Sequence, residues 1–278
     1  MVTPGAERAA VQHLRATYPV SERRACRVVG AGRTMVRYRA RVRRDDAPLR
    51  TRLRELARRP RFGMRRLHVL LRREGLVVNH KRTERLSREE GLAVGRRIRK
   101  RVAHQDRGRP QPPRHPNEQW ALDFVSDALG SGRRIRCLNV VDTGTREALA
   151  IVVDTSLGGE RVAHELDTLV RHRGAPREIV LDNGPELRSK ALDRWASGLG
   201  ITLRFIAPGK PIQNATCESF NGRFRDECLN QHWFLSLSDA QTIIEDWRQD
   251  DNHQRPHGAL GYQTPDAVRR QLLTSGPS

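Results

Sequence analysis

The spacing of apolar residues changes near residue 118, and this change most limits what the chain can fold into. Before it, apolar residues recur at helical spacing; after it, short apolar runs alternate with helical segments. The later order, β-β-β-α-β-α-β-α, predicts a mixed five-stranded sheet flanked by helices. We therefore expect all-α modules ahead of an α/β core that spans residues 118–278.

The predicted strands give two aspartates prominent positions. Asp123 lies within the first strand, where alternation turns it away from the large apolar side chains. Asp182 directly follows the fourth strand, at the edge where open α/β sheets bind ligands. Further strands are expected over residues 134–142, 147–154, 178–181 and around 201–205.

Glu218 lies on a predicted helix after the fifth strand. One stripe of this helix is apolar, with Cys217, Phe220, Phe224 and Cys228, and a second stripe about 100° away is polar. That second stripe contains Glu218, Asn221, Gly222 and Arg225. A carboxylate and a cation therefore project in the same direction, and Gly222 between them permits the close approach of a phosphate.

The three acidic residues form a candidate metal site. Carboxylate oxygens suit Mg²⁺, and a pair of such ions can activate an attacking oxygen and stabilise a leaving oxygen on a phosphodiester. Position alone does not separate them from other acidic residues with similar surroundings, which are Asp127, Asp142, Asp154 and Glu227.

Residues 1–45 are predicted to form a helix-turn-helix module. A helix ending near Val29 is followed by a turn at Gly30 to Gly32 and by a second helix with Met35 and Tyr38. Arg33 and Arg37 are expected to face DNA. A plain helical hairpin with a solvated basic face is the alternative.

Residues 46–95 are predicted to form a second helical, helix-turn-helix-like module. Leucines repeat at helical spacing, and Asn79 is a candidate N-cap for a third helix that carries Arg82 and Arg85. That helix either lies in a DNA groove or faces water. Residues 96–117 read as a basic, proline-rich linker.

Positive charge is concentrated in the first part of the chain. Residues 1–114 contain 33 Lys and Arg against 10 Asp and Glu, whereas residues 115–278 contain 19 against 22. The corresponding net charges, +23 and −3, favour a polyanion-binding half and a separate catalytic half. A basic coat without a specific partner is the alternative.

The remaining composition indicates an intracellular protein. The four cysteines lack metal-ligand spacing and are expected to be small core residues in a reducing compartment. The polar start of the chain and the absence of long apolar runs predict no signal peptide, no membrane span and a cytoplasmic location.

The longest motifs of the core carry a family resemblance. They are Trp120-Ala-Leu-Asp-Phe124, Leu181-Asp-Asn-Gly-Pro185, a stretch from Pro208 to Ala215, one from Glu218 to Asn230, Arg255-Pro-His257 and one from Leu260 to Pro265. The chain resembles the OrfB transposases of the bacterial insertion-sequence family three, relatives of retroviral integrases.

The resemblance implies an RNase H-like catalytic core with Asp123, Asp182 and Glu218 as the DDE triad. It implies two Mg²⁺ ions, which Mn²⁺ can replace, and Arg225 as a basic residue seven positions after Glu218. Lys210, Asn221, Arg223 and Arg225 are expected to bind DNA near the site. Expected partners are double-stranded DNA at element ends and targets, further copies of the chain, and an upstream OrfA-type protein or its fusion.

Four positions depart from the family pattern. Thr216 and Asp251 each stand where the family usually has Tyr, and Met64 and Ser87 stand where it usually has an aromatic residue. None of these changes removes a metal ligand, so a DNA transposase is the favoured interpretation. A catalytically inactive DNA-binding regulator and an RNase H-type or resolvase-type nuclease are the alternatives.

Overall fold

The computed structural model describes residues 3–38, 46–76, 79–94, 113–184, 186–206 and 214–274. The chain divides into two compact units, residues 1–49 and residues 50–278. Most of the predicted linker, residues 96–112, lies outside the described residues. No helix in the described ranges is both long enough and apolar enough to cross a membrane.

Within the first unit, residues 3–38 form three helices, α1 (Pro4–Thr17), α2 (Glu22–Val29) and α3 (Arg33–Arg37). They close around a small core of Val11, Ala25, Cys26 and Ala31. Gly30, with a φ of 75°, ends α2 in the left-handed conformation that favours glycine. The predicted helix around Met35 and Tyr38 ends one residue earlier than expected, because Tyr38 adopts an extended backbone and is exposed.

Three more helices open the second unit. They are α4 (Asp46–Leu56), which crosses the boundary between the units, α5 (Met64–Arg73) and α6 (His80–Glu89). The predicted leucine stripes are buried, with Leu53, Leu67 and Leu71 inaccessible. Asn79 caps α6 as predicted, because its side chain accepts a hydrogen bond of 2.9 Å from the Lys81 N–H.

The core is a mixed five-stranded sheet with the order β3-β2-β1-β4-β5. Its strands are β1 (Gln119–Ala128), β2 (Arg134–Asp142), β3 (Ala148–Asp154), β4 (Glu178–Leu181) and β5 (Thr202–Phe205). The pairs β1–β2 and β2–β3 are antiparallel, whereas β1–β4 and β4–β5 are parallel. The expected sheet is thus confirmed, although β3 begins at Ala148, one residue later than expected.

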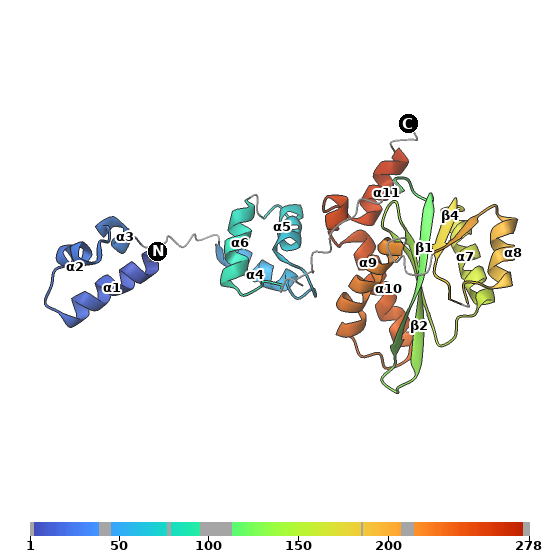
Figure 1. Ribbon diagram of the computed structural model, residues 1–278, viewed down its shortest axis with the longest axis horizontal. Coiled ribbons are helices and arrows are strands. Elements are labelled where there is room, and N and C mark those ends of the chain that lie inside the picture. The colour runs from blue at the N-terminus through green and yellow to red at the C-terminus, as the bar shows by residue number, and fades with distance from the viewer. Residues whose placement is uncertain are drawn as a thin grey trace. The chain divides into compact units, whose positions relative to one another are not determined.

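Helices cover both faces of this sheet (Figure 1). One face carries α7 (Gly159–Arg173) and α8 (Lys190–Gly198), and the other carries α9 (Ala215–Glu227) and α10 (Leu237–His253). Helix α11 (Pro265–Thr274) follows after the short 3₁₀ turns Leu229–Gln231 and Gly258–Leu260. Cys137, Cys217 and Cys228 are buried core residues and Cys26 lies in the first unit's core, as expected.

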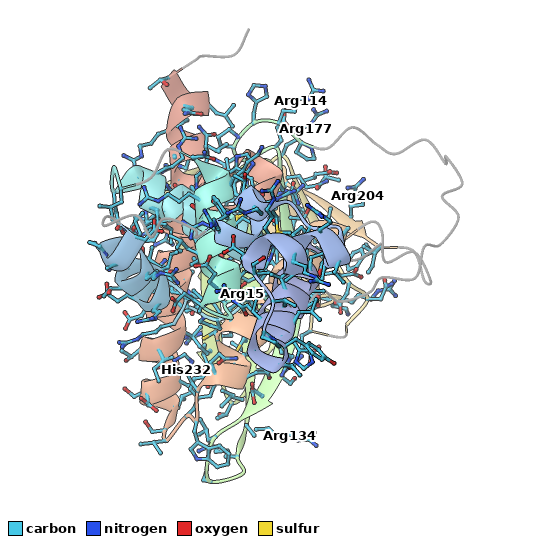
Figure 2. All side chains as sticks on the ribbon, turned by 90° about the vertical axis from the view of Figure 1, so that its left-hand side faces the viewer. Arg15, Arg114, Arg134, Arg177, Arg204 and His232 are labelled. Atoms are coloured by element: carbon cyan, nitrogen blue, oxygen red, sulfur yellow. The ribbon has the colours of Figure 1, made fainter. Side chains whose placement is uncertain are left out.

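The two ends of the sheet are far apart. Arg114 and Arg177 mark the end where β1 and β4 begin, and Arg134 marks the other end, where β2 begins (Figure 2). Asp123 lies between them, within β1.

Candidate active site

Strand register places the two predicted aspartates side by side. β1 and β4 are parallel neighbours, with Trp120 opposite Ile179 and Ala121 opposite Val180. Two residues further along the same register, Asp182 lies next to Asp123. The predicted position of Asp182 at the carboxyl end of β4 therefore brings it to the middle of β1.

A chain of two amides fixes helix α9 over this point. The Asn221 side-chain NH₂ donates to Asp123 Oδ2 at 2.7 Å, and the Asn139 side-chain NH₂ donates to Asn221 Oδ1 at 2.7 Å. Asn139 lies on β2, directly opposite Asp123 in the antiparallel register. Glu218 precedes Asn221 by three residues on α9 and is exposed, so it projects from the same side of the helix.

The three carboxylates influence one another electrostatically. Burial raises the pKa of Asp123 to about 6, and the negative charges of Asp182 and Glu218 contribute to the increase. Hydrogen bonds from the Phe124 N–H and from Asn221 act in the opposite direction and lower the pKa in part. Asp123 is therefore a carboxylate whose charge a nearby cation would stabilise.

The loop after β4 is held to the end of β5. Asp182 accepts a hydrogen bond of 3.0 Å from the Gly184 N–H. The Asn183 side chain donates to the Ile206 carbonyl at 2.8 Å and accepts from Arg188 at 2.7 Å. These contacts fix the loop that carries Asp182.

The donor set fits a hard divalent cation. All three side chains offer oxygen ligands, and their mutual repulsion would be relieved by positive charge. As they stand, no three His, Cys, Asp or Glu side chains within the described ranges are arranged to hold a metal ion. Metal binding would thus require a change in the side-chain arrangement of these carboxylates.

The cations predicted near the site have protein partners. Arg225 donates to the Ser126 carbonyl at 2.6 Å and lies 3.7 Å from Asp127. Arg223 lies on another side of α9 and pairs with Asp251 at 3.5 Å. Lys210 lies outside the described residues.

The arginines predicted to bind DNA in the helical modules also form ion pairs. Arg33 and Arg37 both hydrogen-bond Glu22, at 3.4 and 2.7 Å, although both side chains are about half exposed or more. Arg85 pairs with Glu89 one turn further along α6, and Arg82 is half-buried. In the first unit, Arg23, Arg24 and Arg27 on α2 surround a surface hollow.

The four other acidic residues have structural partners. Asp142 accepts hydrogen bonds from the N–H groups of Asn117, Gly144 and Thr145 and so holds the turn after β2. Asp127 pairs with Arg225, Asp154 accepts from the Thr155 N–H, and Glu227 pairs with Arg255.

Sequence reasoning missed two residues that shape the site's surroundings. Asn139 is fully buried between the apolar residues Leu138 and Val140, and that isolated polar residue was an available signal. Asp251 is fully buried between Arg223, Arg255 and His257, at 3.5, 3.5 and 3.4 Å. In the sequence, the one sign that Asp251 is unusual was that the family normally has Tyr at this position.

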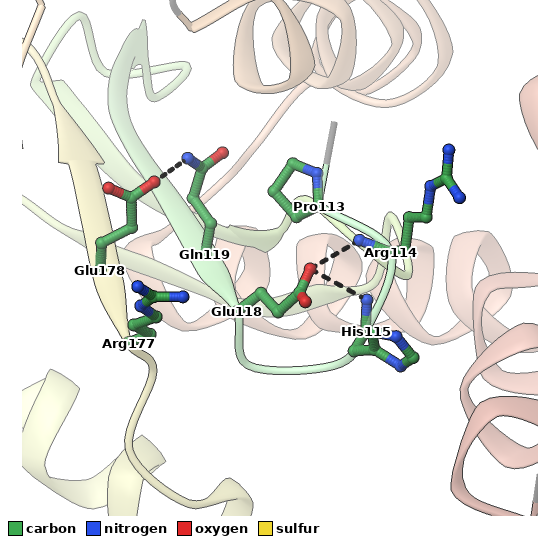
Figure 3. Close-up of a pocket in the computed structure, with 7 residues that line it drawn as sticks. All are labelled: Pro113, Arg114, His115, Glu118, Gln119, Arg177 and Glu178. Atoms are coloured by element: carbon green, nitrogen blue, oxygen red, sulfur yellow. Dashed lines mark hydrogen bonds between the residues drawn. The ribbon is translucent and has the colours of Figure 1, made fainter. Parts of the chain in front are cut away.

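A pocket of about 480 Å³ lies at the opposite end of β1 and β4, away from the carboxylates (Figure 3). Glu118 there accepts hydrogen bonds from the N–H groups of Arg114 and His115, at 2.7 and 3.2 Å, and Gln119 donates to Glu178. Charges of both signs line it, and their mutual contacts pin the start of β1.

The chain is similar to known integrase and insertion-element proteins. Two integrase core domain models match residues 113–211 and 199–265, and an HTH-like domain model matches residues 43–101. A protein of insertion element IS407 from Burkholderia multivorans is 52% identical over 262 residues, covering 93% of this chain and 95% of that protein. The transposase InsD of Escherichia coli insertion element IS2 is 27% identical, covering 79% and 77%.

This chain belongs to the DDE transposases of the IS3 family. A protein of insertion element IS476 from Xanthomonas euvesicatoria is also similar, at 44% identity over 95% of the transposase and 77% of that protein. Among solved structures, a chain of the simian T-cell lymphotropic virus intasome aligns with a TM-score of 0.49 and 16% identity, over 79% of the transposase and 74% of that chain.

The family assignment settles the broad function. The transposase is a DDE polynucleotidyl transferase that acts in DNA transposition, and its core has the expected RNase H-like fold. An HTH-like domain precedes that core.

Proposed function

We propose that Asp123, Asp182 and Glu218 are the catalytic carboxylates of the transposase and hold two Mg²⁺ ions, which Mn²⁺ can replace. The main support is that the β1–β4 register sets Asp182 beside Asp123, while the Asn139–Asn221–Asp123 hydrogen bonds hold α9, the helix that carries Glu218, against β1. Divalent metal bound there would activate the attacking oxygen and stabilise the leaving oxygen of a phosphodiester.

The chain's own residues position the reacting groups. Asn221 orients Asp123, and Asn183 anchors the loop that carries Asp182. Arg225 would exchange its contacts with Ser126 and Asp127 for a DNA phosphate on the side of α9 that bears Glu218. Water attacks first and nicks the element end, and the freed 3′-hydroxyl then attacks a second phosphodiester at the same carboxylates.

The proposed partners follow from the charge distribution. Double-stranded DNA, both element ends and target, would bind the basic first part of the chain, with Arg33, Arg37, Arg82 and Arg85 among its contacts. Several copies of the transposase would assemble on the DNA in the bacterial cytoplasm, together with an OrfA-type protein or as its fusion.

Metal-induced stabilisation tests the site without relying on activity. Adding Mg²⁺ or Mn²⁺ should raise the melting temperature of the full-length protein, because ligands that bind the folded state stabilise it. Asp182→Asn should remove most of the increase, whereas Asp193→Asn, on the exposed side of α8, should keep it. An equal increase in both variants would contradict the ligand assignment.

Cleavage assays separate the transposase from the regulator alternative. A regulator would bind DNA but leave it intact in Mg²⁺. Turnover with Mg²⁺ or Mn²⁺ and little with Ca²⁺, whose looser coordination misplaces the reacting groups, is the expected result.

A further inference from the structure

A second polar pocket lies beside α9, on a different side of the helix from the carboxylates. Its volume is about 610 Å³, and it is bounded by the turn after β2, by α9 and by the segment around His257. Thr216, Ser219 and Arg223 line it and lie roughly 100 to 160° around the helix from Glu218, by the helical period.

The pocket lining is cationic. Arg146 and Arg223 contribute guanidinium groups, His257 an imidazole, and Thr216 and Ser219 hydroxyls. None of the described residues that line it is acidic. Asp251 lies behind Arg223 and is fully buried, so the carboxylate neutralises the arginine from inside the protein.

Arg146 has a neutral partner: its side chain donates to Thr216 Oγ1, and no carboxylate in the described ranges lies within ion-pair distance of it. Burial and the neighbouring charge of Arg223 lower the pKa of Arg146. The Nε group of Arg223 is buried and has no hydrogen-bond partner among the described residues. Two guanidinium groups of the same charge therefore lie close together at this pocket.

The backbone at Arg146 is strained. Its φ is 63°, in the left-handed region that costs a non-glycine residue about 1 kcal/mol or more. Glycine would fit this turn at lower cost, yet the chain places a long cation there. Such strain is commonly retained where the side chain has a function.

We propose that this pocket binds a phosphate group of the DNA strand whose neighbouring segment lies at Asp123, Asp182 and Glu218. The guanidinium forks suit phosphate oxygens, and the two hydroxyls add neutral donors. Because both sites flank one helix, about 10 Å across with its side chains, a strand that crosses α9 can occupy both. The proposal rests on DNA as the substrate.

Salt-dependent binding of a short random-sequence duplex, measured by fluorescence anisotropy with the full-length protein, tests the proposal. Arg146→Gln should weaken binding about tenfold and reduce the slope of log affinity against log salt by about 1, because one phosphate contact is lost. Arg171→Gln, an exposed arginine on α7 across the sheet, is the matched control and should leave the slope unchanged.

The variant Arg146→Gly separates an effect on DNA binding from an effect on protein stability. The variant should weaken DNA binding as Arg146→Gln does, while its melting temperature stays at or above that of the wild-type protein, because glycine relieves the left-handed strain. Equal DNA affinity and salt slope for wild type and both Arg146 variants would overturn the proposal.

Two further results would show whether the pocket assignment or the DNA substrate is wrong. If inorganic phosphate raises the melting temperature of wild type but not of Arg146→Gln, and the DNA slope is unchanged, the pocket takes free phosphate and the DNA assignment is overturned. If the wild-type protein itself shows no salt-dependent DNA binding, the failure lies with DNA as the substrate rather than with the pocket.

Discussion

Asn221 links helix α9 to two strands of the sheet. It accepts a hydrogen bond from Asn139 on β2 and donates one to Asp123 on β1, each at 2.7 Å. Side chains that orient a metal ligand typically change metal affinity or activity by about 10- to 100-fold when removed.

Asn221→Ala should therefore lower kcat for cleavage by roughly 10- to 100-fold and weaken Mg²⁺ binding by a similar factor. Single-turnover cleavage and a Mg²⁺ titration of the melting temperature measure the two effects. Asn230→Ala, at an exposed position, serves as the control. A loss of DNA affinity with unchanged Mg²⁺ binding would show that Asn221 contacts DNA instead of orienting Asp123.

Asp251 is the acidic centre of a buried charge network. Burial alone would raise the pKa of Asp251, but Arg223, His257 and Arg255 together hold it well below the usual range. Asp251→Asn should destabilise the protein by about 3 kcal/mol, because it removes the negative charge that Arg223 contacts and leaves the buried Arg255 with Glu227 as its carboxylate partner. The exposed Asp193→Asn should change stability by less than about 0.5 kcal/mol.

The pH dependence of this effect has a defined sign. A carboxylate with a depressed pKa stabilises the folded state above its unfolded value and loses that contribution as pH falls. The stability difference between wild type and Asp251→Asn should therefore be full at neutral pH and shrink below about pH 4. Chemical denaturation at several pH values measures it; a difference that grows on acidification would refute the assignment.

At the scale of elements, local sequence patterns predicted where the strands begin and end, but they do not determine which strands pair with each other. The bounds 134–142 and 178–181 were predicted to the residue, because charged or turn residues flank apolar runs. The position of β4 beside β1 depends on contacts between distant residues, and no local pattern encodes it. For the same reason the sequence indicated Asp123, Asp182 and Glu218 but could not show that Asn139 and Asn221 hold α9 against Asp123.

Helix α9 contains a glycine where a side chain would fit. A Cβ added at Gly222 would meet no atom within 4 Å, and the residue is exposed on the side of Glu218. Gly222→Ala should stabilise the protein by about 0.5–1 kcal/mol, through helix propensity, and should slow cleavage if a phosphate must approach the helix backbone.

Gly198→Ala is the matched control for this helix prediction. Gly198 ends α8, and a Cβ there also meets nothing within 4 Å. Thermal melting and cleavage rates of the two variants decide the matter: stabilisation in both, with slower cleavage only for Gly222→Ala, is expected. Unchanged cleavage in both would mean that DNA does not approach Gly222.

At the scale of the whole molecule, the uneven charge predicts where DNA affinity resides. Changing Arg23, Arg24 and Arg27 on α2 to Gln should reduce the slope of log affinity against log salt by about 3, since each arginine would neutralise one phosphate. The same number of changes at Arg161, Arg171 and Arg194 on α7 and α8 should have little effect. Equal effects of the two sets would mean that the basic residues of the first unit act only as a solvated coat.

Cleavage of DNA that carries the element ends tests the central claim most directly. In Mg²⁺, the wild-type transposase should nick this DNA and join the freed 3′ end to a second duplex. Asp123→Asn, Asp182→Asn and Glu218→Gln should each abolish both steps while DNA affinity remains largely intact, and Asp127→Asn should retain most activity. Wild-type cleavage by any one of the three variants, or robust cleavage in excess chelator, would contradict a metal site built from these carboxylates.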